Sequence, residues 1–210
     1  AAASMRIYEA YASADLMGYA SLTAGRQALN LGSGALVSSN DWDDVRTNVY
    51  EGMTFGLNLD AADVTIGYHS SNQGGLDEED AGNMWINAGG EFSGWNVNVL
   101  YIQDENEDDN ATGIDISGEL AGASVMASMN TDFAGGEMTM LGATYSVNDD
   151  MNVVGSYTTY GDVAFSSATG NMGVGTESWM SHGNMGYLGA NDENMSLGLT
   201  YNMGSINLGA

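Results

Sequence analysis

The chain has 210 residues and a formal net charge of −25, because 28 Asp and Glu face only three Arg and no Lys. This excess of negative charge repels nucleic-acid phosphates and anionic lipid headgroups, so nucleic acid is excluded as a partner and cations or high salt are favoured. There is no Cys, which excludes disulfides and thiolate metal sites, and no apolar run is long enough for a membrane helix.

From the N-terminus onward, apolar and polar residues alternate with period two, which is the pattern of strands with one apolar face. In one clear case Met53, Phe55, Leu57 and Leu59 alternate with small or polar residues. No segment keeps a helical period over more than two turns. The alternation predicts twelve strands, at residues 4–15, 19–29, 49–59, 63–71, 84–92, 95–103, 112–120, 124–132, 138–147, 151–160, 184–190 and 195–203. A further strand is expected to start within residues 205–210.

The connections between these strands alternate between short and long. The short ones are at residues 16–18, 60–62, 93–94, 121–123, 148–150 and 191–194, and the long ones at 30–48, 72–83, 104–111, 133–137 and 161–183. Bacterial outer-membrane barrels show this order, with short turns at one end and long loops at the other. The predicted fold is therefore all-β: an antiparallel up-and-down transmembrane β-barrel of about 12 or more strands, with residues 1–210 as a single domain.

One face of these strands is expected to meet lipid. Trp95, Val97, Val99 and Tyr101 give an apolar face with an aromatic ring at each end, as in the aromatic belts of membrane barrels. We therefore expect six apolar residues to face outward: Met53, Phe55, Val97, Val99, Leu197 and Leu199. A soluble β-sandwich would show the same alternation, but it would bring these six together in one enclosed core.

Most polar motifs give no specific site. The acidic runs 76–80 and 104–110 could bind Ca²⁺ through carboxylate oxygens, but they do not match a calcium loop and are more typical of solvated loops. His69 is expected to be a hydrogen-bonding residue of the barrel interior, since no other ligand lies near it in sequence. No nucleophile motif occurs, and Ser181-His182 is a dipeptide rather than a triad, so we predict no enzymatic activity, no catalytic residue and no cofactor.

The three arginines are unusual in their placement. Arg6, Arg26 and Arg46 all lie within the first 50 residues. Inside a barrel they could pair with carboxylates such as Glu9 or Asp15 and form a positive spot on an acidic wall. Alternatively, they are scattered cations in an acidic composition. Their spacing alone does not decide between the two interpretations.

The stretch from Arg6 to Asn48 resembles the outer-membrane porins of the alginate-export and Bacteroidetes-porin kind. The matching elements, in order, are Glu9-Ala10-Tyr11, Gly25-Arg26-Gln27, Asn40-Asp41-Trp42 and Arg46. The resemblance covers about a fifth of the chain, counted from the quoted stretch. Members of this family are longer and have an aromatic C-terminal residue, so the chain is expected to be either partial or an unusually small barrel. The alginate exporter of this family has a strongly cationic lumen. With three Arg and no Lys, we do not expect the same specificity here.

The resemblance implies that residues 30–48 fold into or over the barrel mouth. Arg26 and Arg46 would then anchor this segment to acids such as Asp41, Asp43 and Asp44. The pore or constriction residues that follow from this interpretation are Arg6, Glu9, Arg26, Gln27, Asp41, Trp42 and Arg46.

The expected function is a porin-like channel of the bacterial outer membrane, surrounded by outer-membrane lipid, for passive diffusion of small hydrophilic solutes with a leaning toward cations. Homo-oligomerisation and Ca²⁺ binding at the acidic loops are left open. One alternative is an acidic, Ca²⁺-binding or salt-adapted cell-surface protein with a role in assembly. Another is a secreted β-sandwich that binds carbohydrate.

Overall fold

The computed structural model describes residues 7, 9–39, 41–42, 45–46, 49–60, 62–70, 82–105, 109–166, 187–203 and 206–209. Within them, twelve strands form one sheet in the order β1-β2-β5-β6-β7-β8-β9-β10-β11-β12-β13-β14, and every neighbouring pair is antiparallel. Two shorter strands, β3 (Asp41–Trp42) and β4 (Val45–Arg46), pair with each other in a separate hairpin. None of the described residues forms a helix long and apolar enough to cross a membrane.

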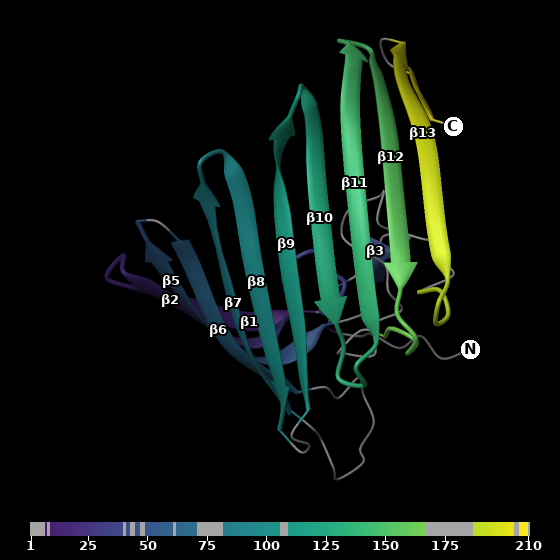
Figure 1. The fold of residues 1–210 in the computed structure, drawn as a ribbon. Coiled ribbons are helices and arrows are strands. Elements are labelled where there is room, and N and C mark those ends of the chain that lie inside the picture. The colour runs from purple at the N-terminus through teal and green to yellow at the C-terminus, as the bar shows by residue number, and fades with distance from the viewer. Residues whose placement is uncertain are drawn as a thin grey trace, which may run out of the picture.

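The strands of the large sheet are β1 (Ala10–Leu16), β2 (Ala20–Gln27), β5 (Tyr50–Leu59), β6 (Ala62–Ser70), β7 (Gly82–Phe92), β8 (Trp95–Asp104), β9 (Asn110–Leu120), β10 (Ala123–Thr131), β11 (Glu137–Asn148), β12 (Met151–Tyr160), β13 (Glu193–Met203) and β14 (Ile206–Gly209). The prediction of an all-β, antiparallel, up-and-down fold with about 12 strands is confirmed. The sheet is strongly curved, with the short turns at one end and the longer connections at the other (Figure 1). No ladder joins β1 to β14 within the described part of the chain.

The short turns explain how successive strands reverse. Three of them place a non-glycine residue and then a glycine at positive φ: Met17-Gly18, Ser93-Gly94 and Ala121-Gly122. Two consecutive residues of positive φ are the signature of type I′ hairpin turns, whose twist matches that of the flanking strands. Glycine takes the second position without a steric cost, so the register of each hairpin is fixed locally.

One predicted strand is wrong. Residues 187–190, the described part of the expected strand 184–190, form a bend and the start of a turn, so they belong to the connection between β12 and β13. The physical reason is that Tyr187 and Leu188, which are consecutive, both pack against the same buried cluster. A strand would have pointed them to opposite faces.

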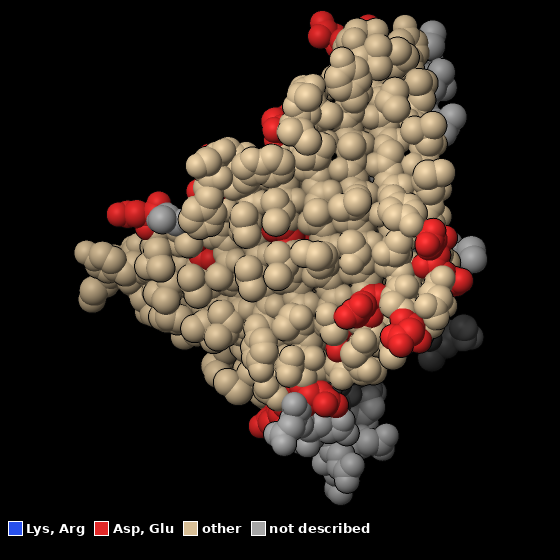
Figure 2. All heavy atoms as spheres, in the orientation of Figure 1, with Lys and Arg blue, Asp and Glu red and all other residues tan. Residues whose placement is uncertain are grey.

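The two faces of the sheet differ as the alternation predicted. Met53, Phe55, Val99, Leu197 and Leu199 are exposed, and the exposed fraction of Leu197 reaches 79%. Val97, the sixth residue expected to face outward, is half-buried. These residues share the convex face rather than one enclosed core, which excludes the soluble sandwich. In the view of Figure 2, Asp and Glu lie mostly toward the margins of a broad uncharged surface.

Buried apolar residues instead lie on the concave side, near the long connections. We call this group the inner core; it comprises Leu29, Leu31, Ala35, Leu36, Val37, Tyr50, Trp85, Leu100, Ile102, Ala111, Met138, Met140, Tyr160 and Phe165. Its existence explains why Leu100 and Ile102 follow Asn96 and Asn98 on one face of β8. Leu100 and Ile102 are at most 2% exposed, because the chain segment that follows β2 covers them from the inside.

Candidate functional site

The segment that follows β2, residues 28–39, folds back on itself inside the curved sheet; we call it the inner segment. Leu31 N donates to Val37 O at 3.1 Å, and Gly34 N donates to Leu31 O at 3.0 Å. Gly32 and Gly34 have φ values of 57° and 80°, which favour glycine. The result is a tight loop with Ser33 at its tip.

The tip of the inner segment contacts strands far along the chain. The Ser33 N–H donates to Asp115 Oδ2 at 2.9 Å, and the Ser128 hydroxyl donates to Asp115 Oδ1 at 2.6 Å. The Ser128 oxygen also lies 3.0 Å from the hydroxyl of Ser33 and accepts a hydrogen bond from Asn130 Nδ2 at 2.8 Å. Both carboxylate oxygens of Asp115 therefore accept hydrogen bonds. Hydrogen bonds to a charged acceptor are stronger than those between neutral groups.

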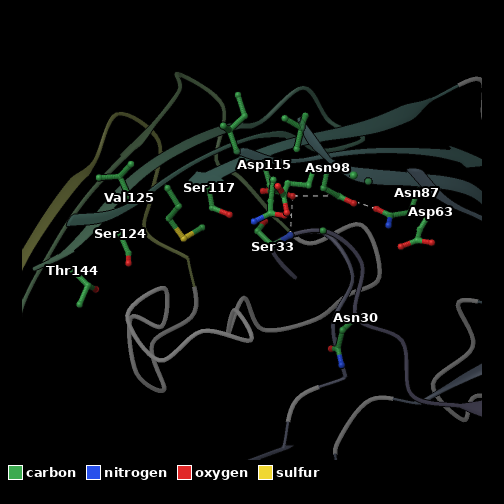
Figure 3. A pocket seen from close by; sticks show the side chains of 18 residues that line it. Asn30, Ser33, Asp63, Asn87, Asn98, Asp115, Ser117, Ser124, Val125 and Thr144 are labelled. Atoms are coloured by element: carbon green, nitrogen blue, oxygen red, sulfur yellow. Dashed lines mark hydrogen bonds between the residues drawn. The ribbon is translucent and has the colours of Figure 1, made fainter. Parts of the chain in front are cut away.

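The same network extends sideways across the sheet. Asn98 Nδ2 donates to Asn87 Oδ1 at 2.9 Å and lies 3.5 Å from Asp115 Oδ2 (Figure 3). We call Asn87, Asn98, Asp115, Ser128 and Asn130 the polar wall. Register explains its continuity, because Asn98 pairs with Asp115 and Asp115 pairs with Ser128 on successive strands. Residues directly opposite on neighbouring strands share a face and lie close enough to interact.

Tyrosine hydroxyls hold the other side of the inner segment. Tyr50 OH donates to Ser38 O at 3.0 Å, and Tyr187 OH donates to Ala35 O at 2.5 Å. Burial raises the pKa of the Tyr187 hydroxyl, so it stays protonated and able to donate. The inner segment is thus fixed from β5, from β9 and β10, and from the long connection that precedes β13.

That long connection is itself tied down by one buried carboxylate. Asp132 Oδ1 accepts hydrogen bonds from the backbone N–H groups of Ala134 and Gly136, and its Oδ2 accepts from the N–H and hydroxyl of Ser166. Next to Ser166, the ring of Phe165 packs edge-on against Tyr187, with centroids 4.7 Å apart. The carboxylate of Asp132 is only 1% exposed, yet all four donors compensate its charge.

Below the inner segment lies a hollow of about 840 Å³ on the concave face. The inner segment contributes Asn30, Gly32 and Ser33 to its lining, and the polar wall contributes Asn87, Asn98 and Asp115. The charged residues that line it are Asp63, Glu91 and Asp115, and no Arg or His is among the described lining residues. Figure 3 shows Asp63 near Asn87 at one end and Thr144 at the other.

Two of the residues predicted for the constriction, Glu9 and Gln27, line a second hollow of about 440 Å³ beside β1 and β2. Its other lining residues are Tyr11, Ser13, Thr23 and Ala28. Gln27 is buried. This hollow is separate from the one below the inner segment, which neither Glu9 nor Gln27 lines.

Arg26 is placed differently from the expectation. Its Nη1 forms an ion pair with Glu51 Oε1 at 3.1 Å, and Glu51 is its direct cross-strand neighbour. Arg26 alternates with the buried Gln27, so its side chain leaves the sheet on the opposite face from the inner segment. The alternation therefore argues against Arg26 as an anchor of that segment.

The other predicted residues are described less fully. In the β3–β4 hairpin Asp41 pairs with Arg46 and Trp42 with Val45, and only the backbone of these residues is described. Arg6, Asp43 and Asp44 lie outside the described residues, as does the acidic run 76–80. Within the described part of the chain, no three His, Asp or Glu gather as a metal site would require.

Sequence reasoning missed the residues that hold the inner segment. Asp115, Ser33, Ser128 and Asn130 are not among the site residues predicted from the sequence. A signal did exist for Asp115, which is a lone charge between Ile114 and Ile116 in the middle of a strand. A buried or half-buried charge of this kind requires a partner, so its position indicates a contact inside the sheet.

Comparisons with known proteins support the fold. No family model matches the chain, and no curated protein matches it. The structure is similar to OccAB4 of Acinetobacter baumannii, with a TM-score of 0.63 at 16% identity over 88% of this chain and 52% of that one. It is also similar to OccAB1 of the same organism, with a TM-score of 0.62 at 13% identity over 89% of this chain and 54% of that one. The chain thus spans about half the length of these two proteins.

Both similar structures are outer-membrane β-barrel channel proteins. The chain therefore shares the all-β, antiparallel, up-and-down fold of these β-barrels. This agrees with the porin part of the resemblance seen in the sequence, but it does not point to the alginate-export or Bacteroidetes kind.

Proposed function

We propose that the chain forms an outer-membrane channel for the passive diffusion of small hydrophilic solutes, with a preference for cations. The observation that carries this proposal is the inner segment, which is fixed against the polar wall by Asp115 and Ser128. A chain segment held on the concave side of a barrel wall narrows the passage without closing the hollow beneath it. Fixed polar groups beside a narrow passage are what a diffusion channel needs to select solutes.

The preference for cations follows from the charges beside the passage. Asp63, Glu91 and Asp115 line the hollow, whereas Arg26 leaves the sheet on the other face. Rings or rows of carboxylates favour cations in pores because they attract positive ions and repel negative ones. Neutral hydrophilic solutes would pass by hydrogen bonding to amides such as Asn87 and Asn98.

The convex face supports the proposed location in the membrane. Exposed apolar residues such as Leu197 and Met195 cover it, and tyrosines such as Tyr68 and Tyr157 lie near the long-loop ends of their strands. We propose that outer-membrane lipid surrounds this face and that residues 1–210 belong to one barrel domain. We propose no enzymatic activity, cofactor or nucleic-acid partner, and homo-oligomerisation remains a proposal for experiment.

Planar-bilayer recording tests this function. The purified protein is inserted into a neutral bilayer between two KCl solutions of different concentration, and the zero-current potential is measured. We expect discrete conductance steps and a potential of the sign given by cation flow, decreasing as salt is raised on both sides, because salt screens the carboxylates. An anion preference at low salt would contradict the proposed selectivity, and an absence of conductance steps would contradict the channel itself.

A further inference from the structure

A buried cluster that combines two inner-core residues with two polar ones lies on strands β5, β6 and β7. Tyr50, His69, Asn83 and Trp85 are each at most 2% exposed. Trp85 Nε1 donates to His69 Nδ1 at 3.0 Å, and the rings of Tyr50 and His69 pack edge to face with centroids 4.9 Å apart. None of these four residues contacts the polar wall through the bonds described above.

The bond from Trp85 fixes the tautomer of His69. An indole N–H can only donate, so Nδ1 must offer its lone pair and the proton of the neutral imidazole must be on Nε2. Nε2 has no hydrogen-bond partner among the described residues, although it is fully buried. A buried N–H donor without an acceptor costs about 1–3 kcal/mol, so such groups rarely stay unpaired.

A matching acceptor lies on the next strand. Asn83 is the direct cross-strand partner of His69, and its Oδ1 is likewise buried without a donor in the described part of the chain. Directly paired residues present their side chains on the same face, about 4.5–5.5 Å apart at Cβ. One unsatisfied donor and one unsatisfied acceptor therefore belong to neighbouring side chains.

We infer that His69 and Asn83 hold one buried water molecule, which accepts from the imidazole N–H and donates to the amide oxygen. A donor on one side and an acceptor on the other favour a molecule that can both accept and donate, such as water, over an ion. An anion would suit the N–H but would be repelled by the amide oxygen, and a cation would be repelled by the N–H. A metal ion would need the lone pair of Nε2, which the tautomer excludes. Buried waters normally join polar groups of this kind.

This water would lie at the far end of a series of buried contacts that reaches the inner segment. The water would contact His69, whose ring packs against Tyr50, and the Tyr50 hydroxyl holds Ser38 O at 3.0 Å. The inference does not depend on channel activity, since it concerns only the folded interior.

The test is nitrogen NMR of the lipid-reconstituted protein labelled with ¹⁵N-histidine. The chain has two histidines, so His182→Gln leaves a single imidazole and assigns the signals. We expect a protonated Nε2, an unprotonated Nδ1 and a through-space contact between the Nε2 proton and water. A protonated Nδ1, or an Nε2 proton without a water contact, would overturn the inference.

A substitution tests the role of Asn83. Asn83→Leu removes the amide oxygen at similar volume, and we expect the water contact at His69 to be lost. Asn96→Leu is the matched control, at an exposed position of the next strand, and should leave the contact unchanged. Retention of the contact in Asn83→Leu would overturn the bridging arrangement. If Asn83→Leu does not fold, the measurement on the parent protein decides.

Discussion

The Asp115 carboxylate contacts both the inner segment and the neighbouring strand, through Ser33 N–H and the Ser128 hydroxyl. It is also one of the charges that line the hollow. This one residue thus combines a positioning role with an electrostatic one. The two roles can be separated by two substitutions. One removes the charge of Asp115 together with its contacts to the inner segment, and the other removes a different charge of the hollow and leaves those contacts in place.

Asp115→Asn keeps the size of the side chain but replaces one acceptor oxygen by an amino group. If the amino group faces Ser33 N–H, this donor loses its acceptor, at a cost of about 1–3 kcal/mol. If it faces Ser128, the Ser128 hydroxyl loses its charge-assisted bond and donates to Ser33 Oγ instead. We expect the inner segment to loosen, giving larger or noisier single-channel currents and a weaker cation preference in bilayer recordings.

Asp63→Asn is the matched control, because Asp63 lines the same hollow but makes no described bond to the inner segment. It should weaken the cation preference while the current steps keep the size and steadiness of the parent. If both variants give equally steady currents, Asp115 does not position the inner segment.

Arg26→Ala tests the expectation drawn from the sequence. The ion pair with Glu51 is partly exposed, with 29% and 64% of the two side chains accessible, and such pairs contribute about 0–1 kcal/mol. We now expect unchanged single-channel conductance and almost unchanged heat stability. A clear rise in conductance would restore the anchoring role that the arginine placement suggested.

At the level of strands, the sequence was sufficient for most of the fold. Period-two alternation and turn glycines are local signals, and they located the strands and the order of short and long connections. The strand expected over residues 187–190 did not form because Tyr187 and Leu188 take their positions from contacts with the distant inner core. Likewise, the hydrogen bond between Ser33 and Asp115 joins residues 82 positions apart, which no local pattern reveals.

Close strand packing gives a prediction at this level. A methyl group on Gly67 would overlap the indole ring atoms of Trp85, which is only 1% exposed and cannot turn away. Gly67→Ala should therefore destabilise the barrel by about 1–3 kcal/mol, as overpacking does. Urea unfolding in lipid vesicles measures the change.

Gly155→Ala is the control for this substitution. The nearest atom to a methyl group at Gly155 would be Ser196 O at 3.9 Å, an ordinary contact. We expect the unfolding midpoint of Gly155→Ala to stay close to that of the parent. Equal midpoints for both variants would show that Trp85 can move aside.

For the molecule as a whole, the dominant property is the net charge of −25. Self-repulsion among the carboxylates opposes the folded state, and salt screens it: the Debye length falls from about 30 Å at 0.01 M to about 8 Å at 0.15 M. The thermal midpoint in a non-ionic detergent should therefore rise as NaCl is added, measured by circular dichroism at constant pH.

A chelator distinguishes general screening from specific Ca²⁺ binding. With ionic strength held constant, removal of divalent ions should leave the thermal midpoint unchanged if screening alone acts. A marked drop would instead indicate Ca²⁺ at acidic loops such as 76–80, and would favour the alternative role in cell-surface assembly.

The contacts of the inner segment also set an order of assembly. Three of its partners, Asp115, Ser128 and Tyr187, are 82, 95 and 152 residues away, whereas the hairpins with short turns close over a few residues. Local hairpins form sooner because their loop-closure entropy is smaller. The wall should therefore be built before the inner segment can dock, and a barrel caught midway would offer a wider opening than the finished one.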